Sequence, residues 1–401
     1  MSPIDRDALI EFTRRLVRER SVNRPEDGCS EQSAAELVAE QMRGFGWEPV
    51  VDEAAPGRPN VIARLEGADP GPTLMLEGHV DVVTEGDARA WTHPPFAAEI
   101  ADGRLYGRGA ADMKAGVAAM LFAAHALARE RFAGTVVVAA LVDEEGMMIG
   151  VRDFVRRGRA RHVDAALVCE PEGGEVCVAQ KGAIRLRVDA AGRMAHGAMP
   201  HHGDNPIPRL ARFLAACSGV QDELQRANGE DPYLGWDYIT PTFALAGGEA
   251  QLNVIPGRAA AGLDVRTTPA TDHGRLVERL RAELEPGMTL TVLDDRPPTR
   301  TSDDHPLVAA VREAHRRRHG APPSLGGVPG ATDGTILFAE AGIPIVTYGP
   351  GGKWIAHQVD EYVDVDELVA YADVYLDAAR AYLRGAGAPA AGSSGSTSTL
   401  S

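Results

Sequence analysis

The sequence predicts an α/β protein in which a mainly parallel-sheet domain carries an inserted α+β domain. Three observations support this fold class. Short apolar runs alternate with helical patterns, as they do where helices cover both faces of a parallel sheet. Histidine, aspartate or glutamate follows the end of each apolar run. From about residue 178 the hydrophobic pattern changes to period two, which is typical of a half-exposed antiparallel sheet.

The parallel sheet is predicted from continuous apolar runs that are bounded by turn residues. Helical periodicity lies between these runs, and an amphipathic helix at 5–18 precedes them. The predicted strands are 73–76, 135–142, 165–169 and 343–348, and the predicted helices between them are 34–45, 115–130 and 148–157.

The inserted domain is predicted at 178–293, where apolar and charged residues alternate around Leu186 and Leu263. Two helical stretches, 206–226 and 271–284, lie in the same region. The first domain therefore comprises 1–177 and 294–384. Residues 385–401 contain no charged residue and are rich in Gly, Ala, Ser and Thr, which predicts a disordered tail.

Composition excludes several classes of function. With 57 Asp+Glu against 41 Lys+Arg, the chain has a formal charge of −16, which does not suit a nucleic-acid partner. We expect no membrane association, because the apolar run 115–128 is shorter than the roughly 20 residues of a spanning helix. Four cysteines without a CxxC pair and no secretory-signal pattern predict a cytoplasmic protein with reduced thiols.

The residues after the apolar runs could carry chemistry, because the carboxyl ends of parallel strands meet at one edge of a sheet. His79 is a possible metal ligand, and Asp81 could accept its second ring N–H. Of Glu144 and Glu145, one could bind a metal while the other acts as a general base. Read singly, these residues are equally compatible with capped or acidic surface turns, and Glu170 and His357 with structural roles.

Their convergence favours a metal centre. Mixed histidine and carboxylate ligation suits Zn²⁺ or a similar divalent ion, and two ions sharing one carboxylate would offset the clustered negative charge. Nucleotide binding is a poorer fit, because the glycine-rich segments at 107–116 and 349–353 lack the P-loop pattern.

The sequence resembles the zinc amidohydrolase and metallopeptidase family that contains acetylornithine deacetylase, succinyl-diaminopimelate desuccinylase and glutamate carboxypeptidase. The matching motifs stand in family order and cover the chain except its tail. They are GHVD (78–81), YGRGAADMK (106–114), DEEG (143–146), CEP (169–171), HGAMP (196–200), GDNPI (203–207), NVIPG (253–257), DVR (264–266), ATD (331–333) and AH (356–357).

The resemblance implies a catalytic domain of the zinc-peptidase type with two divalent metal ions, Zn²⁺ first and Co²⁺ or Mn²⁺ as alternatives. Asp112 would bridge the ions, and the Asp112–Met113 peptide would be cis. Glu144 would be the general base and Asp81 the partner of His79. The remaining ligands would be His79 and Glu170 for one ion, and Glu145 and His357 for the other.

The resemblance also implies a homodimer in which the inserted domain is the lid and His196 reaches across the interface to stabilise the oxyanion. Arg266, Asn253 and Lys181 would contact the substrate, although Arg266 could instead pair with Asp264. The chain departs from the family pattern at ATD, where GTD is commoner, and at Asp360, where Asn is commoner. We expect neither departure to touch a ligand, but both to bear on the substrate pocket.

The predicted function is hydrolysis of the amide bond of a small N-acyl amino acid with a free carboxylate, by attack of a metal-bound water. Glu170 favours this branch, because dipeptidases and aminoacylases more often carry Asp there. The alternatives are a carboxypeptidase or dipeptidase and a hydrolytic deaminase on the same metal centre. A metal-binding protein without turnover is disfavoured, because every inferred ligand and Glu144 are present.

Overall fold

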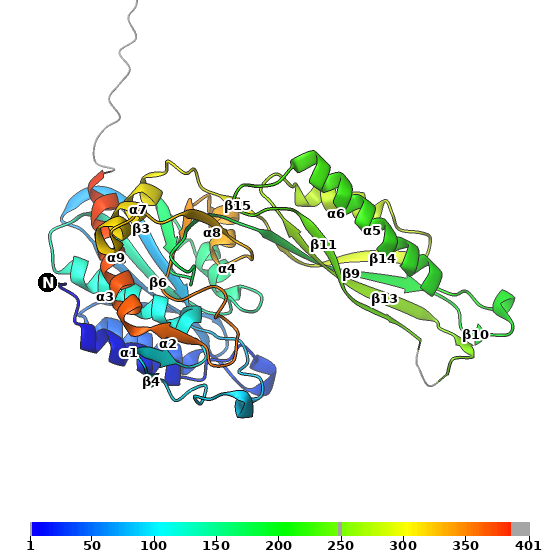
Figure 1. Cartoon of the computed structure of the whole chain (residues 1–401), viewed down its shortest axis with the longest axis horizontal. Helices are drawn as coiled ribbons and strands as arrows, with labels where there is room; N and C mark the ends of the chain where they lie inside the picture. The colour runs from blue at the N-terminus through cyan, green and yellow to red at the C-terminus, as the bar shows by residue number, and fades with distance from the viewer. Residues whose placement is uncertain (1, 248–250, 386–401) are drawn as a thin grey trace, which may run out of the picture. The chain divides into compact units, whose positions relative to one another are not determined.

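A computed structural model describes residues 2–247 and 251–385 of the chain (Figure 1). Contacts between residues divide the chain into two compact units. Of the described residues, unit 1 comprises 2–174, 303–323 and 348–385, and unit 2 comprises 175–247, 251–302 and 324–347.

The main sheet of unit 1 has the strand order β1-β2-β6-β3-β7. β3 pairs in parallel with both β6 and β7, whereas β2 pairs antiparallel with β6 and β1. Three of the four predicted parallel strands, at 73–76, 135–142 and 165–169, thus pair in parallel here, and β1 and β2 add an antiparallel part that the apolar runs did not reveal. The fourth, 343–348, corresponds to β17 (Ile345–Thr347) of unit 2, which pairs antiparallel with β8 (Val176–Gln180). The bounds are β1 Val50–Ala55, β2 Arg58–Glu66, β3 Asp69–His79, β6 Ala133–Leu141 and β7 Ala165–Val168.

The helices of unit 1 form where capping residues and apolar periodicity agree. Asp5 caps α1 by accepting the N–H of Ala8, and Pro306 begins α7, which ends at a left-handed Gly320. Both α3 and α9 contact β3 and β6. The bounds are α1 Arg6–Arg18, α2 Gln32–Gly44, α3 Ala115–Ala128, α4 Ile149–Arg156, α7 Pro306–His319 and α9 Val365–Gly385.

The apolar segment that contains α3 is a core element of unit 1. By length and composition Ala110–Ala128 could cross a membrane, but 89% of its most apolar 18-residue stretch is buried inside the structure. Ala110–Lys114, which holds Asp112 and is labelled η3, precedes α3, and the Asp112–Met113 peptide is cis, as predicted. A small sheet in the order β18-β5-β4 completes the unit, with bounds β4 Glu99–Ala101, β5 Arg104–Tyr106 and β18 Tyr362–Asp364.

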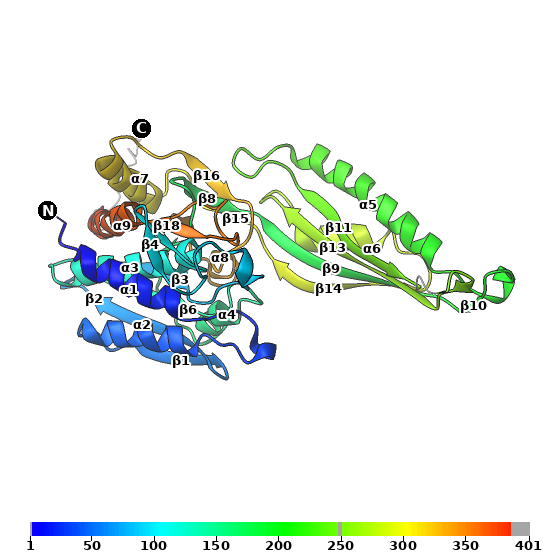
Figure 2. The ribbon, with the colours of Figure 1, turned by 60° about the horizontal axis from the view of Figure 1, so that its bottom comes forward.

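Unit 2 contains a four-stranded antiparallel sheet in the order β11-β13-β9-β14. Its alternating apolar residues, such as Leu186 and Leu263, pack with α5 and α6 into one hydrophobic core. Figure 2 shows both helices beside this sheet. The predicted antiparallel sheet with two helices is therefore confirmed, with bounds β9 Gly182–Ala191, α5 Ile207–Asn228, β11 Tyr238–Ala246, β13 Arg258–Thr267, α6 His273–Arg281 and β14 Met288–Arg296.

The other strands of unit 2 gather around β8, which pairs in parallel with β16 and antiparallel with β15 and β17. A short antiparallel pair, β10-β12, brings His196 opposite Val254. The bounds are β8 Val176–Gln180, β10 Ala195–His196, β12 Val254–Ile255, β15 Thr299–Arg300, β16 Leu325–Val328, α8 Gly334–Ala341 and β17 Ile345–Thr347.

The predicted lid domain, 178–293, lies within unit 2, which also includes residues 324–347. The exact domain boundaries stay a prediction. The predicted disordered tail, 385–401, lies outside the described residues except for Gly385, which ends α9.

Candidate metal centre

Two strand ends of unit 1 bring His79 and Glu170 together. His79 is the last residue of β3, and Glu170 follows β7, the parallel neighbour of β3. The His79 Nε2 atom lies 3.4 Å from Glu170 Oε1, and 3.2 Å from Asp112 Oδ1. The side chain of His79 is 1% exposed. These three residues are called the inner group below.

A second set of ligand candidates shares Asp112 and lies nearer to solvent. The His357 Nε2 atom is 2.8 Å from Glu145 Oε1 and 3.1 Å from Asp112 Oδ2. Glu145 follows β6, whereas His357 stands in the loop before β18, with its side chain 50% exposed. Glu145, His357 and Asp112 are called the outer group below.

Asp112 belongs to both groups and presents one carboxylate oxygen to each histidine. Ligand atoms bound tetrahedrally to Zn²⁺ at 2.0–2.2 Å stand about 3.3 Å apart, which is close to most of the separations in the two groups. Suitable ligand atoms of His79, Asp112 and Glu145 also lie within 4.8 Å of one another. The donor types and their spacing therefore fit a pair of divalent ions.

The electrostatics of the groups also fit a cation. Burial and the charge of Asp112 raise the pKa of Glu170 to about 8, and the same causes raise the pKa of Glu145. Hydrogen bonds to Asp112 and Glu145 raise the pKa of His357 to about 10. Without metal, protons thus compensate the clustered carboxylates, and a divalent ion would displace those protons on binding.

Glu144 and Asp81 lie beside the inner group. A carboxylate oxygen of Glu144 is within 4.8 Å of ligand atoms of both His79 and Glu170. Asp81 is buried, its carbonyl oxygen lies 3.0 Å from His79 Nδ1, and its carboxylate accepts the N–H groups of Glu144 and Glu145. The predicted contact of the Asp81 carboxylate with the second ring nitrogen of His79 measures 3.4 Å, longer than that of the Asp81 carbonyl, so both parts of Asp81 face the ring and its carboxylate also holds the turn after β6.

Two buried arginine–glutamate pairs lie beside the centre, and no prediction from the sequence included them. Arg58 pairs with Glu31 and Asp143, and Asn23 connects this network by donating to both Asp143 and Asp81. The second pair is Arg108–Glu361, whose residues lie within the matching motif 106–114 and beside the departure at Asp360. Their positions in or beside these motifs were the features of the sequence that could have indicated a role near the metal centre. Asp360 itself accepts the N–H groups of residues 92 and 93.

The predicted substrate and oxyanion residues all belong to unit 2. His196 is exposed, and its Nδ1 atom accepts the N–H of Ala198. Asn253 is exposed and its carbonyl accepts the N–H of Gly197. Arg266 forms a two-point ion pair with Asp264, which is the alternative left open for it. Lys181 is buried, and its ammonium group donates to the carbonyl of Trp236.

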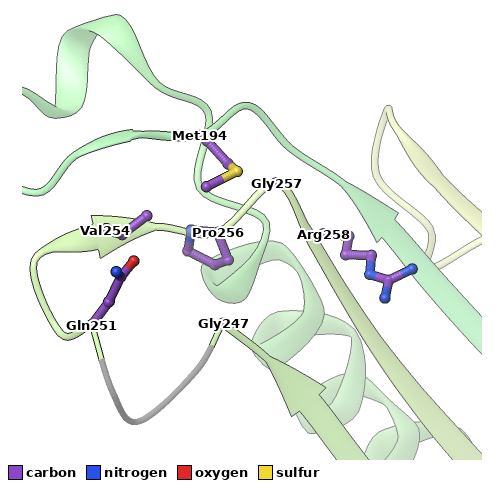
Figure 3. Close-up of a pocket in the computed structure, with 7 residues that line it drawn as sticks. All are labelled: Met194, Gly247, Gln251, Val254, Pro256, Gly257 and Arg258. Atoms are coloured by element: carbon purple, nitrogen blue, oxygen red, sulfur yellow. The ribbon is translucent and has the colours of Figure 1, made fainter.

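A cavity of about 640 Å³ lies in unit 2 beside the β10-β12 pair (Figure 3). Met194 packs against Gly257 at its edge. The cavity does not include the predicted metal ligands, which all belong to unit 1. Its lining residues are Met194, Gly247, Gln251, Val254, Pro256, Gly257 and Arg258.

Fold and site together define a metal-dependent hydrolase. The chain belongs to peptidase family M20/M25/M40, whose model matches residues 75–381, and the predicted family is thereby confirmed. It is similar to succinyl-diaminopimelate desuccinylase of Methylobacterium radiotolerans, with 33% identity across 94% of this chain and 98% of the relative. The enzyme of the same name from Methylorubrum extorquens is 34% identical across 90% of this chain and 96% of the relative.

Solved structures of the family share the fold. An M20 family metallo-carboxypeptidase from Sulfolobus solfataricus superposes with a TM-score of 0.78 at 20% identity, across 94% of this chain and 99% of that one. A dinuclear metal-binding M20 peptidase from Bacillus subtilis gives a TM-score of 0.70 at 18% identity, across 94% and 98%. The chain is thus a hydrolase that acts on C–N bonds, and the α/β fold class is confirmed.

Proposed function

We propose that the chain hydrolyses the amide bond of a small N-acyl amino acid, with an N-succinyl amino acid as the first candidate substrate. The observation that carries this proposal is the similarity to desuccinylases over nearly the whole chain. Glu170 agrees with it, as explained above. The two peptidase structures are 20% and 18% identical to this chain, so they support the fold alone.

We propose two Zn²⁺ ions at the centre, with Co²⁺ or Mn²⁺ as alternatives that similar ligands accept. His79 and Glu170 would hold one ion, Glu145 and His357 the other, and Asp112 would bridge them. When bound, the ions would lower the pKa of a water molecule and polarise the scissile carbonyl group.

Glu144 would act as the general base. It would take a proton from the attacking water and pass that proton to the leaving nitrogen, so that water and the amide give a carboxylate and an amine. Its carboxylate is close enough to the inner group for this role. His196 would donate a hydrogen bond to the oxyanion as charge develops there.

Arg266 would recognise the free carboxylate of the substrate, since its planar guanidinium can bind a carboxylate at two points. Asp264 now occupies that position, so a substrate carboxylate would replace it. Asn253 is exposed and would bind the substrate backbone. Lys181 is the weakest of the three candidates because its ammonium group is already committed to a carbonyl.

We further propose a homodimer in which His196 acts across the interface. The edge strand β11 supports dimer formation, because it exposes Tyr238 (43%), Phe243 (45%) and Leu245 (67%) on an unpaired sheet edge. Mixing Glu144→Gln subunits with His196→Ala subunits should restore activity in hybrid dimers. Absence of rescue despite subunit exchange would rule out the shared site.

The substrate proposal is tested by a turnover screen of the metal-reconstituted enzyme. The panel should contain succinylated and acetylated amino acids, dipeptides with free carboxylates, and amines for deamination. We expect the succinylated amino acids to give the highest kcat/KM. Preference for dipeptides would replace the deacylase proposal with a peptidase.

The role of Glu144 is tested by Glu144→Gln. We expect kcat to fall roughly 10²–10⁴-fold, the usual contribution of a general base, while metal content is unchanged. Asp153→Asn provides a matched control, because Asp153 is a buried carboxylate of unit 1 whose ion-pair partners, Arg156 and Arg157, lie at the end of α4 and directly after it. Full activity in Glu144→Gln would remove its assigned role.

A further inference from the structure

We propose that the buried Arg108–Glu361 ion pair is a positioning device for the outer group, setting the distance between Asp112 and His357. The inference rests on the proposed dinuclear centre and adds to it the residues that make the outer site bind metal. Arg108 and Glu361 have side chains that are 3% and 0% exposed. Neither is a ligand candidate, so both would act through the residues that they hold.

Glu361 holds the segment that carries Asp112. Its Oε1 atom accepts the backbone N–H groups of Ala111 at 2.9 Å and Asp112 at 3.0 Å. Its own carbonyl accepts the N–H of Gly107. A carboxylate that receives two consecutive backbone N–H groups fixes the direction of that backbone, and charge makes these hydrogen bonds stronger than neutral ones.

Arg108 connects Glu361 to His357. One terminal nitrogen of its guanidinium pairs with Glu361 Oε2, and the other donates to the carbonyl of His357 at 3.2 Å. The guanidinium is planar, so its two nitrogens hold their partners in a fixed relation. The Arg108 side chain thereby links the backbones of two members of the outer group. It reaches Asp112 through Glu361 and His357 directly.

His357 needs such an anchor. Its backbone is left-handed (φ 65°), which is unfavourable for a residue with a Cβ unless neighbours hold it. It stands in a loop with its side chain half exposed. The hydrogen bond from Arg108 to its carbonyl provides a buried tether at this point.

The two residues that belong to the inner group alone, His79 and Glu170, are held by other contacts. His79 ends a strand that is paired on both sides, and its ring is oriented by Asp81. Glu170 follows Cys169, whose N–H is bonded to the carbonyl of Glu77 on β3. Loss of the Arg108 contact to His357 should therefore weaken the outer ion more than the inner ion, because only the shared Asp112 connects the inner group to the Arg108–Glu361 pair.

The test is calorimetric titration of the metal-free protein with Zn²⁺. Wild type should bind two ions per chain. Arg108→Met should keep one tight ion and bind the other at least about tenfold more weakly, the low end of the usual effect of residues that support metal ligands. Glu361→Gln also loosens the shared Asp112, so it should weaken the outer ion more than the inner ion but affect both. Arg108→Lys keeps the charge but loses the planar fork, so it should show the same selective loss.

A double variant separates positioning from folding. Arg108→Met leaves the Glu361 charge buried without its partner, which should lower the Tm of the metal-free protein, whereas Arg108→Met/Glu361→Gln should recover part of that Tm. Affinity for the second ion should stay low in the double variant because the tether to His357 is still absent. Asp153→Asn should bind both ions like wild type.

The outcomes are distinguishable. Suppose that wild type binds two ions. Unchanged affinity for both ions in Arg108→Met and Arg108→Lys would then overturn the positioning role, and so would equal weakening of both ions. Recovery of the second ion together with Tm in the double variant would also overturn it. Fewer than two ions in wild type would overturn the dinuclear proposal itself.

Discussion

The inner and outer groups of the metal centre use the same types of ligand but are built differently. The inner histidine, His79, ends a central strand and is 1% exposed, whereas the outer histidine, His357, lies in a loop and is 50% exposed. Strand ends are fixed by the hydrogen bonds of the sheet, so their ligands need few further supports. A ligand on a loop needs a dedicated anchor, and Arg108 provides one. The hydrogen bonds of the sheet thus position His79 in the inner group, whereas His357 in the outer group depends on tertiary contacts.

The largest expected difference between the groups is in the effect of removing each histidine. His79→Ala should leave less than one ion per chain, because Asp112 loses its inner partner and the buried Glu170 loses compensation. His357→Ala should keep one ion. Both should lose more activity than the roughly 10–100-fold that loss of a supporting residue costs.

Metal analysis after dialysis, together with kcat/KM, measures this difference. His93→Ala is the control, because His93 pairs with Glu99 and stacks on Tyr106 outside both groups. Equal metal content in His79→Ala and His357→Ala would show that the two halves are equivalent.

The second prediction concerns removal of metal by a chelator. The outer ion should leave at least about tenfold faster than the inner ion, because solvent reaches His357 and dissociation requires only a loop to move. Metal content against time should therefore show two phases. The single ion of His357→Ala should leave at the slow rate, which identifies it as the inner one. A single fast phase in that variant would contradict the assignment.

The sequence predicted the ligands better than their supports. His79, Glu145 and Glu170 could be predicted to meet because they follow apolar runs that form neighbouring strands. The structure brings His79 and Glu145 close to Asp112, and Glu170 close to His79. The roles of individual ligands came from the resemblance and stay a proposal.

The buried supports could not be predicted from local pattern. Arg108 and Glu361 are 253 positions apart, and a polar residue that is buried only by tertiary contact leaves no hydrophobic periodicity. The assignment of residues 324–347 to unit 2 also depends on contacts between distant parts of the chain, because β16 and β17 both pair with β8. The edge strand β1 was missed because it is largely exposed and carries no continuous apolar run, and its neighbour β2 was missed because its buried half includes the polar residues Arg58 and Asn60.

The third prediction uses pH to separate the groups in the metal-free protein. The pKa of Glu170 is raised to about 8, above its unfolded value near 4.5, so the folded state holds this proton more tightly. Its contribution to stability is present below pH 4.5 and is lost as pH rises to 8. For His357, with a pKa raised to about 10, the contribution is present below pH 6.5 and is lost as pH rises through 10.

The Tm of the metal-free protein should therefore fall by several degrees as pH rises from 5 to 8 and should continue to fall above that. Glu170→Gln should flatten the lower part of this profile, and His357→Asn the upper part. The metal-loaded protein should lack the decline, because metal replaces these protons. If the Tm of the metal-loaded protein fell by the same amount, the groups responsible for the fall would lie outside the metal centre.

The smallest expected effect comes from Asn23→Ala, on the inner side. Asn23 donates to Asp81 Oδ2 at 2.8 Å and to Asp143 Oδ1 at 3.0 Å, so its loss removes two of the hydrogen bonds behind the inner group. Each is worth about 1 kcal/mol, but Asp81 keeps the N–H groups of Glu144 and Glu145 as partners. We expect only a few-fold loss of inner-ion affinity in the Zn²⁺ titration, and none for the outer ion. A loss larger than that caused by Arg108→Met on the outer ion would mean that the inner group, too, depends on tertiary anchors rather than on the strand ends that carry it.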